Sequence, residues 1–97
     1  MDNQHRKITG YRELSQAEID LMNRIKAKGA ELLDLHAELA AMLGNQHIQK
    51  SMNEASDPVE LDRFRAAEPL RWAAIGKTDI QTGIMALVRA VAQPGGV

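Results

Sequence analysis

The chain contains an uninterrupted run, residues 15–43, with no proline and with apolar side chains at spacings of three and four. That periodicity places the apolar side chains on one face of an α-helix. Ser15-Gln16-Ala17-Glu18 has the pattern of a capping box, in which serine and glutamate side chains satisfy backbone N–H groups of the first turn. We therefore predict a long helix over residues 15–43 that ends at Gly44-Asn45. Its apolar stripe consists of Met22, Ile25, Gly29, Leu32, His36, Leu39 and Leu43.

The second half of the chain predicts a loop, a short helix and another long helix. Residues 45–56 are polar and favour a connecting loop. Asp57-Pro58-Val59-Glu60 is a helix start, with aspartate as the cap and proline in the first turn. Pro69 indicates a kink or a break, and an apolar helix is expected over residues 70–93. The stripe of that helix consists of Ala73, Lys77, Ile80, Ile84, Leu87 and Val91.

Composition supports a single all-α domain over residues 1–97, with residues 1–14 as an N-terminal arm. Aromatic residues make up only 3% of the sequence, so aliphatic side chains must build the core, which favours helices over a β-barrel. The predicted fold is a helical hairpin of two long antiparallel helices, with a loop and short connecting helix over residues 44–69. Two helices expose more apolar surface than they can cover for each other, so we expect homo-oligomers.

Charge and cysteine content exclude several classes of function. A net charge of -1 removes the electrostatic basis for wrapping duplex DNA, and the absence of cysteine excludes disulfides and thiolate metal sites. The polar N-terminus does not resemble a signal peptide, and no stretch approaches the length of a membrane span. We expect a cytoplasmic protein that binds neither membranes nor duplex nucleic acid.

Motifs for catalysis or metal binding are not apparent in the sequence. Gly76-Lys77-Thr78 has the ending of a phosphate-binding P-loop, but Arg71 stands where that motif requires glycine, and the segment lies inside a predicted helix. The histidines His5, His36 and His47 do not have the spacing of a metal site, and His36 is expected to be a buried or interfacial residue with its own hydrogen bonds. We expect neither an enzyme nor a bound cofactor.

One set of residues has the composition of a binding site for a small anion that carries a base. A tyrosine ring can stack on a purine, a lysine can neutralise a phosphate, and a threonine hydroxyl can add a hydrogen bond. The alternative is structural: Tyr11 packs against the hairpin and the basic side chains extend along it. The residues concerned are Tyr11, Arg12, Lys26, Arg71, Lys77, Thr78, Thr82 and Arg89.

Two segments of the chain resemble the signatures of a known family. Residues 8–14 (ITGYREL), continuing into residues 18–26 (EIDLMNRIK) and Gly29, closely resemble the N-terminal signature of the phage anti-CBASS cyclic-oligonucleotide sponges. Residues 71–91 (RWAAIGKTDIQTGIMALVRAV) are similar to the second signature of the same hairpin superfamily, which also includes sponges for cyclic ADP-ribose signals. The resemblance spans nearly the whole chain, apart from the central loop.

The resemblance implies a homohexamer, a trimer of dimers, that binds the second messengers of antiphage systems without cleaving them. A pocket between protomers takes cyclic dinucleotides such as cyclic GMP–AMP (cGAMP). Its implied residues here are Tyr11 for base stacking, Lys26 for phosphate and Thr82 from another protomer, with Arg12 beside Tyr11 added from the set above. The expected location is the cytoplasm of the infected bacterial host.

The resemblance also implies a second pocket, for cyclic trinucleotides, near the start of the last helix. Basic and small polar residues form it in many members of the family, and the candidates here are Arg71, Lys77, Thr78 and Arg65. Two other classes of protein remain as alternatives. One is a structural or adaptor coiled-coil oligomer without a nucleotide ligand, and the other is a small helical DNA-binding regulator, which the charge disfavours.

Overall fold

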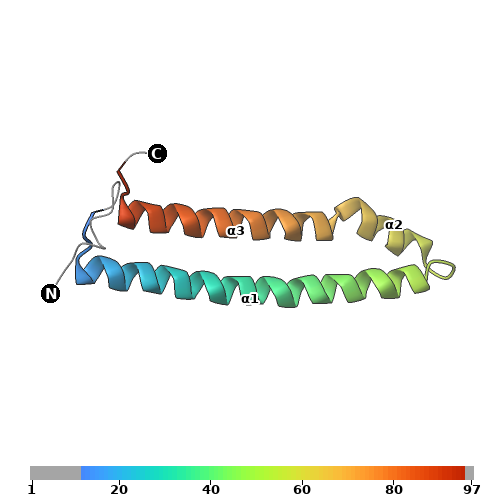
Figure 1. Ribbon diagram of the computed structural model, residues 1–97. Coiled ribbons are helices and arrows are strands. Elements are labelled where there is room, and N and C mark those ends of the chain that lie inside the picture. Colours follow the sequence, from blue (N-terminus) through green and yellow to red (C-terminus); the bar gives the residue numbers. More distant parts are fainter. Residues whose placement is uncertain (1–11, 96–97) are drawn as a thin grey trace. The chain divides into compact units, whose positions relative to one another are not determined.

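The computed structural model describes residues 12–95, and within this range every regular element is an α-helix. In chain order these are α1 (Gln16–Met52), α2 (Pro58–Ala67) and α3 (Pro69–Ala92) (Figure 1). The prediction of an all-α fold is confirmed. Packing divides the chain into two compact units, one formed by Met1–Ala30 with Gln81–Val97 and the other by Glu31–Ile80. The long helices α1 and α3 each contribute a segment to both units.

The start of α1 is the capping box that the sequence predicts. The backbone N–H of Glu18 donates to the Ser15 hydroxyl at 3.2 Å, and the backbone N–H of Ser15 donates to the Glu18 carboxylate at 3.0 Å. Two N–H groups that have no partner within the helix are thereby satisfied. The cap fixes the residue at which the helix begins.

The predicted end of the first helix is wrong, because α1 continues through Gly44 to Met52. The predicted loop over residues 45–56 shrinks accordingly to a turn between α1 and α2. A glycine inside a helix costs only about 1 kcal/mol, and packing of the extra turns against α2 offsets that cost. The ring of His47 stacks on Phe64 with centroids 5.9 Å apart, and Lys50 Nζ lies 3.3 Å from a Glu60 carboxylate oxygen.

The helix α2 begins and ends at the signals found in the sequence. The Asp57 side chain accepts a hydrogen bond from the Glu60 N–H at 3.2 Å, and Pro58 occupies the first turn. At its other end Glu68 adopts a left-handed conformation (φ 50°, ψ 49°), which ends α2 and bends the chain before α3 starts at Pro69. The predicted break at Pro69 is confirmed.

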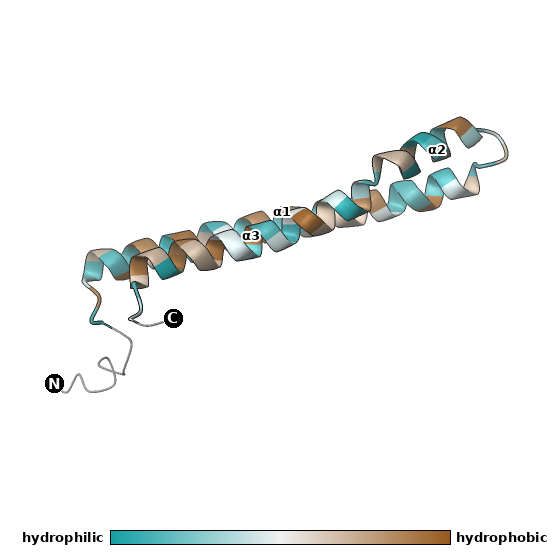
Figure 2. Ribbon diagram, turned by 90° about the horizontal axis from the view of Figure 1, so that it is seen from above, coloured by the Kyte–Doolittle hydropathy of each residue, from teal (hydrophilic) through white to brown (hydrophobic). Residues whose placement is uncertain are grey.

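Few apolar side chains are buried in the described part of the chain. Leu43, Leu61 and Phe64 form the buried core, and all three belong to the unit Glu31–Ile80. Hydrophobic residues, coloured brown in Figure 2, occur along both α1 and α3, and many of the large ones are exposed. The prediction that the chain leaves apolar surface uncovered is confirmed, whereas its assembly stays a prediction. The large exposed apolar residues are Leu21, Leu32, Leu35, Leu39, Met42, Ile48, Met52, Val59, Leu70, Trp72, Met85 and Leu87.

In the other unit, α1 and α3 meet at Gly29, which is buried. A Cβ atom added to Gly29 would lie 2.7 Å from Cγ1 of Ile84 and closer still to its terminal carbon. The glycine thus allows an approach between the two helices that any side chain would prevent. None of the helices in the described range combines the length and the apolar character required to cross a membrane.

Candidate functional site

The residues predicted for the dinucleotide pocket fall in the unit formed by the start of α1 and the end of α3. Tyr11 lies outside the described residues. Lys26 is exposed on α1 and Thr82 is exposed on α3. Both side chains are therefore accessible to a ligand, and neither has a hydrogen bond or ion pair among those found in residues 12–95.

Helix geometry separates Thr82 from the contact between α1 and α3. Successive residues of an α-helix are rotated by about 100°, so Thr82 points about 200° away from Ile84. Ile84 contacts Gly29 of α1, and Thr82 consequently faces away from α1. Lys26 precedes Gly29 by three residues and lies on the flank of that contact. The fold of one chain does not bring Lys26 and Thr82 together.

Arg12 is also predicted for the dinucleotide pocket, and its guanidinium already donates hydrogen bonds to groups of its own chain. Its Nη1 atom donates to the Glu18 carboxylate at 3.3 Å, and Nη2 donates both to the other Glu18 oxygen and to the Val91 backbone carbonyl, the latter at 2.8 Å. The guanidinium lowers the pKa of Glu18 to about 2, and hydrogen bonds from Ser15 assist. The hydrogen bond from Arg12 to Glu18 in turn raises the pKa of Arg12. This group of contacts is not apparent from the sequence, because Val91 is distant in the chain.

Two of the trinucleotide candidates line one small hollow between α2 and α3. Arg65 and Arg71 share this hollow of about 220 Å³ with His47, Phe64 and Glu68, and with Pro69 and Leu70. The Arg71 guanidinium lies over the Trp72 ring, 5.1 Å from its centre, and 3.6 Å from a Glu68 carboxylate oxygen. The hollow itself therefore combines the rings of His47 and Phe64 with the side chains of two arginines.

Lys77 and Thr78 do not line this hollow, although both are exposed on α3. The Thr78 hydroxyl donates to the backbone carbonyl of Ala74 at 3.3 Å. Gly76-Lys77-Thr78 lies in the interior of α3, as the sequence predicts, and not between a strand and a helix. The segment therefore lacks the loop whose backbone N–H groups hold phosphate in a P-loop.

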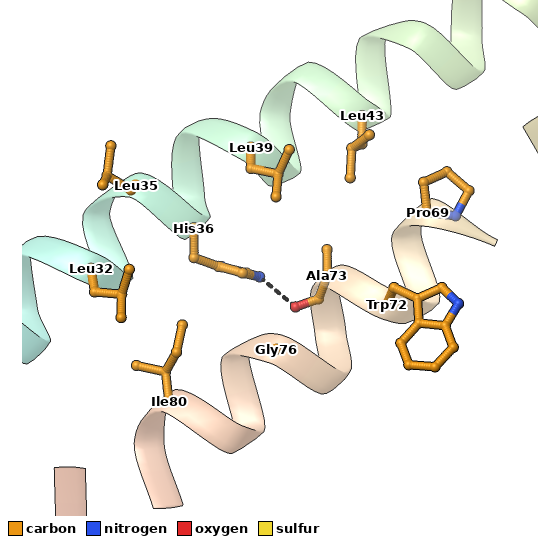
Figure 3. A pocket seen from close by; sticks show the side chains of 10 residues that line it. All are labelled: Leu32, Leu35, His36, Leu39, Leu43, Pro69, Trp72, Ala73, Gly76 and Ile80. Atoms are coloured by element: carbon orange, nitrogen blue, oxygen red, sulfur yellow. Dashed lines mark hydrogen bonds between the residues drawn. The ribbon is translucent and has the colours of Figure 1, made fainter. Parts of the chain in front are cut away.

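An apolar groove of about 510 Å³ lies between α1 and α3 in the unit Glu31–Ile80 (Figure 3). His36 spans this groove, and its Nε2 atom lies 2.9 Å from the Ala73 carbonyl. Because a carbonyl only accepts, the hydrogen is on Nε2, and the prediction of a histidine with its own hydrogen bond is confirmed. The groove is lined by Leu32, Leu35, His36, Leu39, Leu43, Pro69, Trp72, Ala73, Gly76 and Ile80.

A polar hollow of about 500 Å³ adjoins the turn between α1 and α2, and it was not predicted. Arg63, and then Lys50, lower the pKa of Glu60 in this hollow to about 2. The sequence gives no signal for this hollow, because Gln49 and Lys50 line it only when α1 continues past Gly44. Within residues 12–95, no three histidine, aspartate or glutamate side chains gather as a metal site would require. The hollow is lined by Gln49, Lys50, Asn53, Ser56, Asp57 and Glu60.

Comparison with known proteins gives two concordant matches. A curated protein from Pseudomonas phage JBD67, named "Anti-CBASS protein 2", is 62% identical over an alignment of 107 positions that covers 99% of each chain. The family model "Acb2/Tad1, hairpin domain" matches residues 3–92, which include all three helices. The resemblance of the two sequence segments to this family is confirmed. The chain belongs to the Acb2/Tad1 hairpin-domain family.

Proposed function

We propose that this protein counters CBASS immunity by binding cyclic oligonucleotide second messengers and holding them without cleavage. Cyclic dinucleotides such as cGAMP are the first class of ligand, and cyclic trinucleotides are the second. The observation that carries the proposal is the similarity, over 99% of both chains, to a phage protein named for an anti-CBASS role. A protein that sequesters a messenger needs affinity and a closed pocket, and it needs no catalytic group.

Lys26 and Thr82 contribute to the dinucleotide pocket from two different chains, together with Tyr11. This arrangement agrees with the exposure of both side chains and with the orientation of Thr82 away from α1 in its own chain. Burial of the ligand between protomers lowers the local dielectric constant, which strengthens the hydrogen bonds between Lys26 and phosphate. Stacking of a base on Tyr11 adds about 1–3 kcal/mol.

The trinucleotide pocket forms around the hollow between α2 and α3. Arg65 and Arg71 supply planar guanidinium groups suited to phosphate, and both line that hollow. Lys77 and Thr78 are further along α3 and join the pocket from a neighbouring chain. Glu68 lies close to Arg71, so a bound phosphate competes with this carboxylate for the guanidinium.

Assembly into a homohexamer, a trimer of dimers, covers the exposed apolar side chains and completes the pockets. The exposed apolar residues lie on both long helices, from Leu21 to Leu87. Together they form more apolar surface than a monomer of this size usually exposes. Light scattering coupled to size-exclusion chromatography tests the assembly. A mass of six chains is expected, and a monomer at working concentration would exclude pockets made by two chains.

Calorimetric titration with 3′,3′-cGAMP tests the binding claim. We expect submicromolar affinity for the natural sequence and a loss of about tenfold or more for Lys26→Ala and for Thr82→Val, which keeps the shape of threonine but removes its hydroxyl. Arg24→Ala is the matched control for charge. It removes an exposed cation from the same helix, about 200° away from Lys26, and we expect unchanged affinity.

The alternative is an adaptor coiled-coil oligomer that has no nucleotide ligand. The exposed apolar residues favour assembly equally under this alternative, so the oligomeric state does not separate the two functions. A well-folded oligomer that releases no heat with any cyclic di- or trinucleotide would support the adaptor. Equal losses for Lys26→Ala and Arg24→Ala would indicate nonspecific attraction of an anion and would exclude the proposed pocket.

A further inference from the structure

We infer that Glu68 limits the affinity of the hollow between α2 and α3, because its carboxylate occupies the Arg71 guanidinium until a phosphate of the ligand replaces it. This inference rests on the proposed function, since it concerns the same trinucleotide pocket. Binding at Arg71 is then an exchange of one anion for another. All the residues that carry the argument are described and belong to the unit Glu31–Ile80.

The contact between Glu68 and Arg71 is a loose one. A Glu68 carboxylate oxygen lies 3.6 Å from Arg71 Nη1, and the two side chains are 54% and 56% exposed. In the described part of the chain, no hydrogen bond joins them. The pair formed by Glu60 and Arg63 in α2 shows the contrast, because Arg63 donates to both oxygens of that carboxylate. An exposed ion pair without a hydrogen bond contributes little to stability, so another anion can replace the Glu68 carboxylate.

Trp72 holds the Arg71 guanidinium by a contact that uses none of its N–H donors. The central carbon of the guanidinium lies 5.1 Å from the centre of the Trp72 ring, within the range of a cation–π interaction. This interaction depends on the positive charge and on the face of the ring. Departure of the Glu68 carboxylate therefore leaves Arg71 at the hollow, with its donors free for the paired hydrogen bonds that a guanidinium makes with phosphate.

The bend between α2 and α3 depends on the main chain of Glu68 and not on its carboxylate. The Glu68 N–H donates to the Arg65 carbonyl at 3.2 Å, and the Glu68 carbonyl accepts from the Trp72 N–H at 3.1 Å. The residue is left-handed, a conformation that asparagine adopts more readily than most residues. The side chain can thus be changed while the hydrogen bonds that end α2 and begin α3 are kept.

Arg65 gives an incoming ligand its first point of attachment. It lines the same hollow of about 220 Å³, and within residues 12–95 its side chain makes no hydrogen bond or ion pair. A phosphate bound to Arg65 keeps the next phosphate of the same cyclic molecule near Arg71. That second phosphate then competes with the Glu68 carboxylate at a high effective concentration.

Calorimetric titration of the assembled protein with cyclic tri-AMP, a cyclic trinucleotide, measures the effect of removing the carboxylate. Glu68→Gln keeps the size of the side chain and removes its charge, and it should raise the affinity about two- to fivefold. Glu68→Asn should give a similar gain and suits the left-handed backbone, so it covers a failure of Glu68→Gln to fold. Glu54→Gln is the matched control. It removes an exposed carboxylate of the turn between α1 and α2 that does not line the hollow, and the affinity should not change.

The same substitution in an Arg71→Ala background shows whether Glu68 acts through Arg71. Glu68→Gln should give no gain there, because no guanidinium remains to be released. An equal gain in both backgrounds would mean that Glu68 repels the ligand directly, and it would overturn the exchange. Unchanged or weaker binding by both Glu68→Gln and Glu68→Asn, with Arg71 present, would overturn it as well.

Failure of this inference is distinguishable from failure of the proposed function. Affinity for 3′,3′-cGAMP should be the same in Glu68→Gln as in the natural sequence, because Lys26 and Thr82 belong to the other packing unit. Binding of cyclic tri-AMP by the natural chain, with no gain from either Glu68 variant, overturns the exchange alone. If the natural chain and both variants bind cGAMP but no cyclic trinucleotide, the exchange and the trinucleotide pocket are both overturned. Absence of binding to either class overturns the proposed function itself.

Discussion

Gly29 of α1 lies against Ile84 of α3 so closely that no side chain fits between the two helices at this point. A Cβ on Gly29 would be 2.7 Å from Ile84 Cγ1, well inside van der Waals contact. Ile84 is β-branched and therefore stiff at χ1, so it cannot turn aside without cost. The glycine sets the distance between α1 and α3 in the unit that carries Lys26 and Thr82.

Gly29→Ala should destabilise the protein although alanine is the better helix former. Overpacking costs about 1–3 kcal/mol and exceeds the gain of about 1 kcal/mol in helix propensity. Thermal unfolding followed by circular dichroism measures the net change, and we expect a lower Tm. An unchanged or higher Tm would mean that α1 and α3 do not approach so closely at Gly29 that a methyl group is excluded.

Gly44→Ala is the matched control for Gly29→Ala, and it also tests the corrected end of α1. Nothing lies within 4 Å of a Cβ added to Gly44, which is inside α1. The substitution should therefore stabilise the protein by about 0.5–1 kcal/mol. If α1 ended at Gly44 with the glycine in a left-handed conformation, alanine would be destabilising instead.

Leu61→Ala should be strongly destabilising, because Leu61 is the most buried side chain in the described residues. It is 1% exposed, and truncation of a buried leucine costs about 2–5 kcal/mol through lost burial and the cavity that remains. Val59→Ala in the same helix is the control, since Val59 is 76% exposed and should change stability by less than about 0.5 kcal/mol. Urea unfolding measures both, and similar losses for the two variants would contradict the packing of α2.

Acid should loosen the contact between Arg12 and Glu18 over a defined pH range. Arg12, and then Ser15, lower the pKa of Glu18 from 4.5 to about 2 in the folded chain. The stabilisation is therefore fully present above pH 4.5 and is lost as the pH falls towards 2. Carboxyl NMR titration measures this pKa directly. In Arg12→Ala it should rise towards the ordinary value, and an unchanged value would exclude Arg12 as the main cause.

Local signals in the sequence were sufficient to predict where most helices begin. Ser15, Asp57 and Pro69 each act through neighbours within a few residues, so their effects could be predicted without the fold. The end of α1 could not be predicted in this way. Gly44 is compatible with both a helix end and a helix interior, and the contact of His47 with Phe64 of α2 favours the interior.

In the candidate site too, features set by neighbouring residues could be predicted from the sequence, whereas contacts between distant residues could not. Exposure of Lys26 and Thr82 could be predicted from their positions on amphipathic helices, and both are exposed. The engagement of Arg12 by Val91 joins opposite ends of the chain, so the sequence could suggest Arg12 only as a cation available to a ligand. The shared hollow of Arg65 and Arg71 likewise depends on the left-handed conformation of Glu68, which sets the bend between the end of α2 and the start of α3.

The central claim is that the protein holds a cyclic messenger without cleaving it. Retention of the messenger and its recovery in intact form test this claim most directly. The protein is mixed with a limiting amount of 3′,3′-cGAMP and passed over an ultrafiltration membrane, and the retained fraction is digested with proteinase and separated by chromatography. We expect the messenger to stay with the protein before digestion and to be released afterwards as the intact cyclic molecule. Free passage of the messenger through the membrane, or recovery of a linear product, would contradict the account.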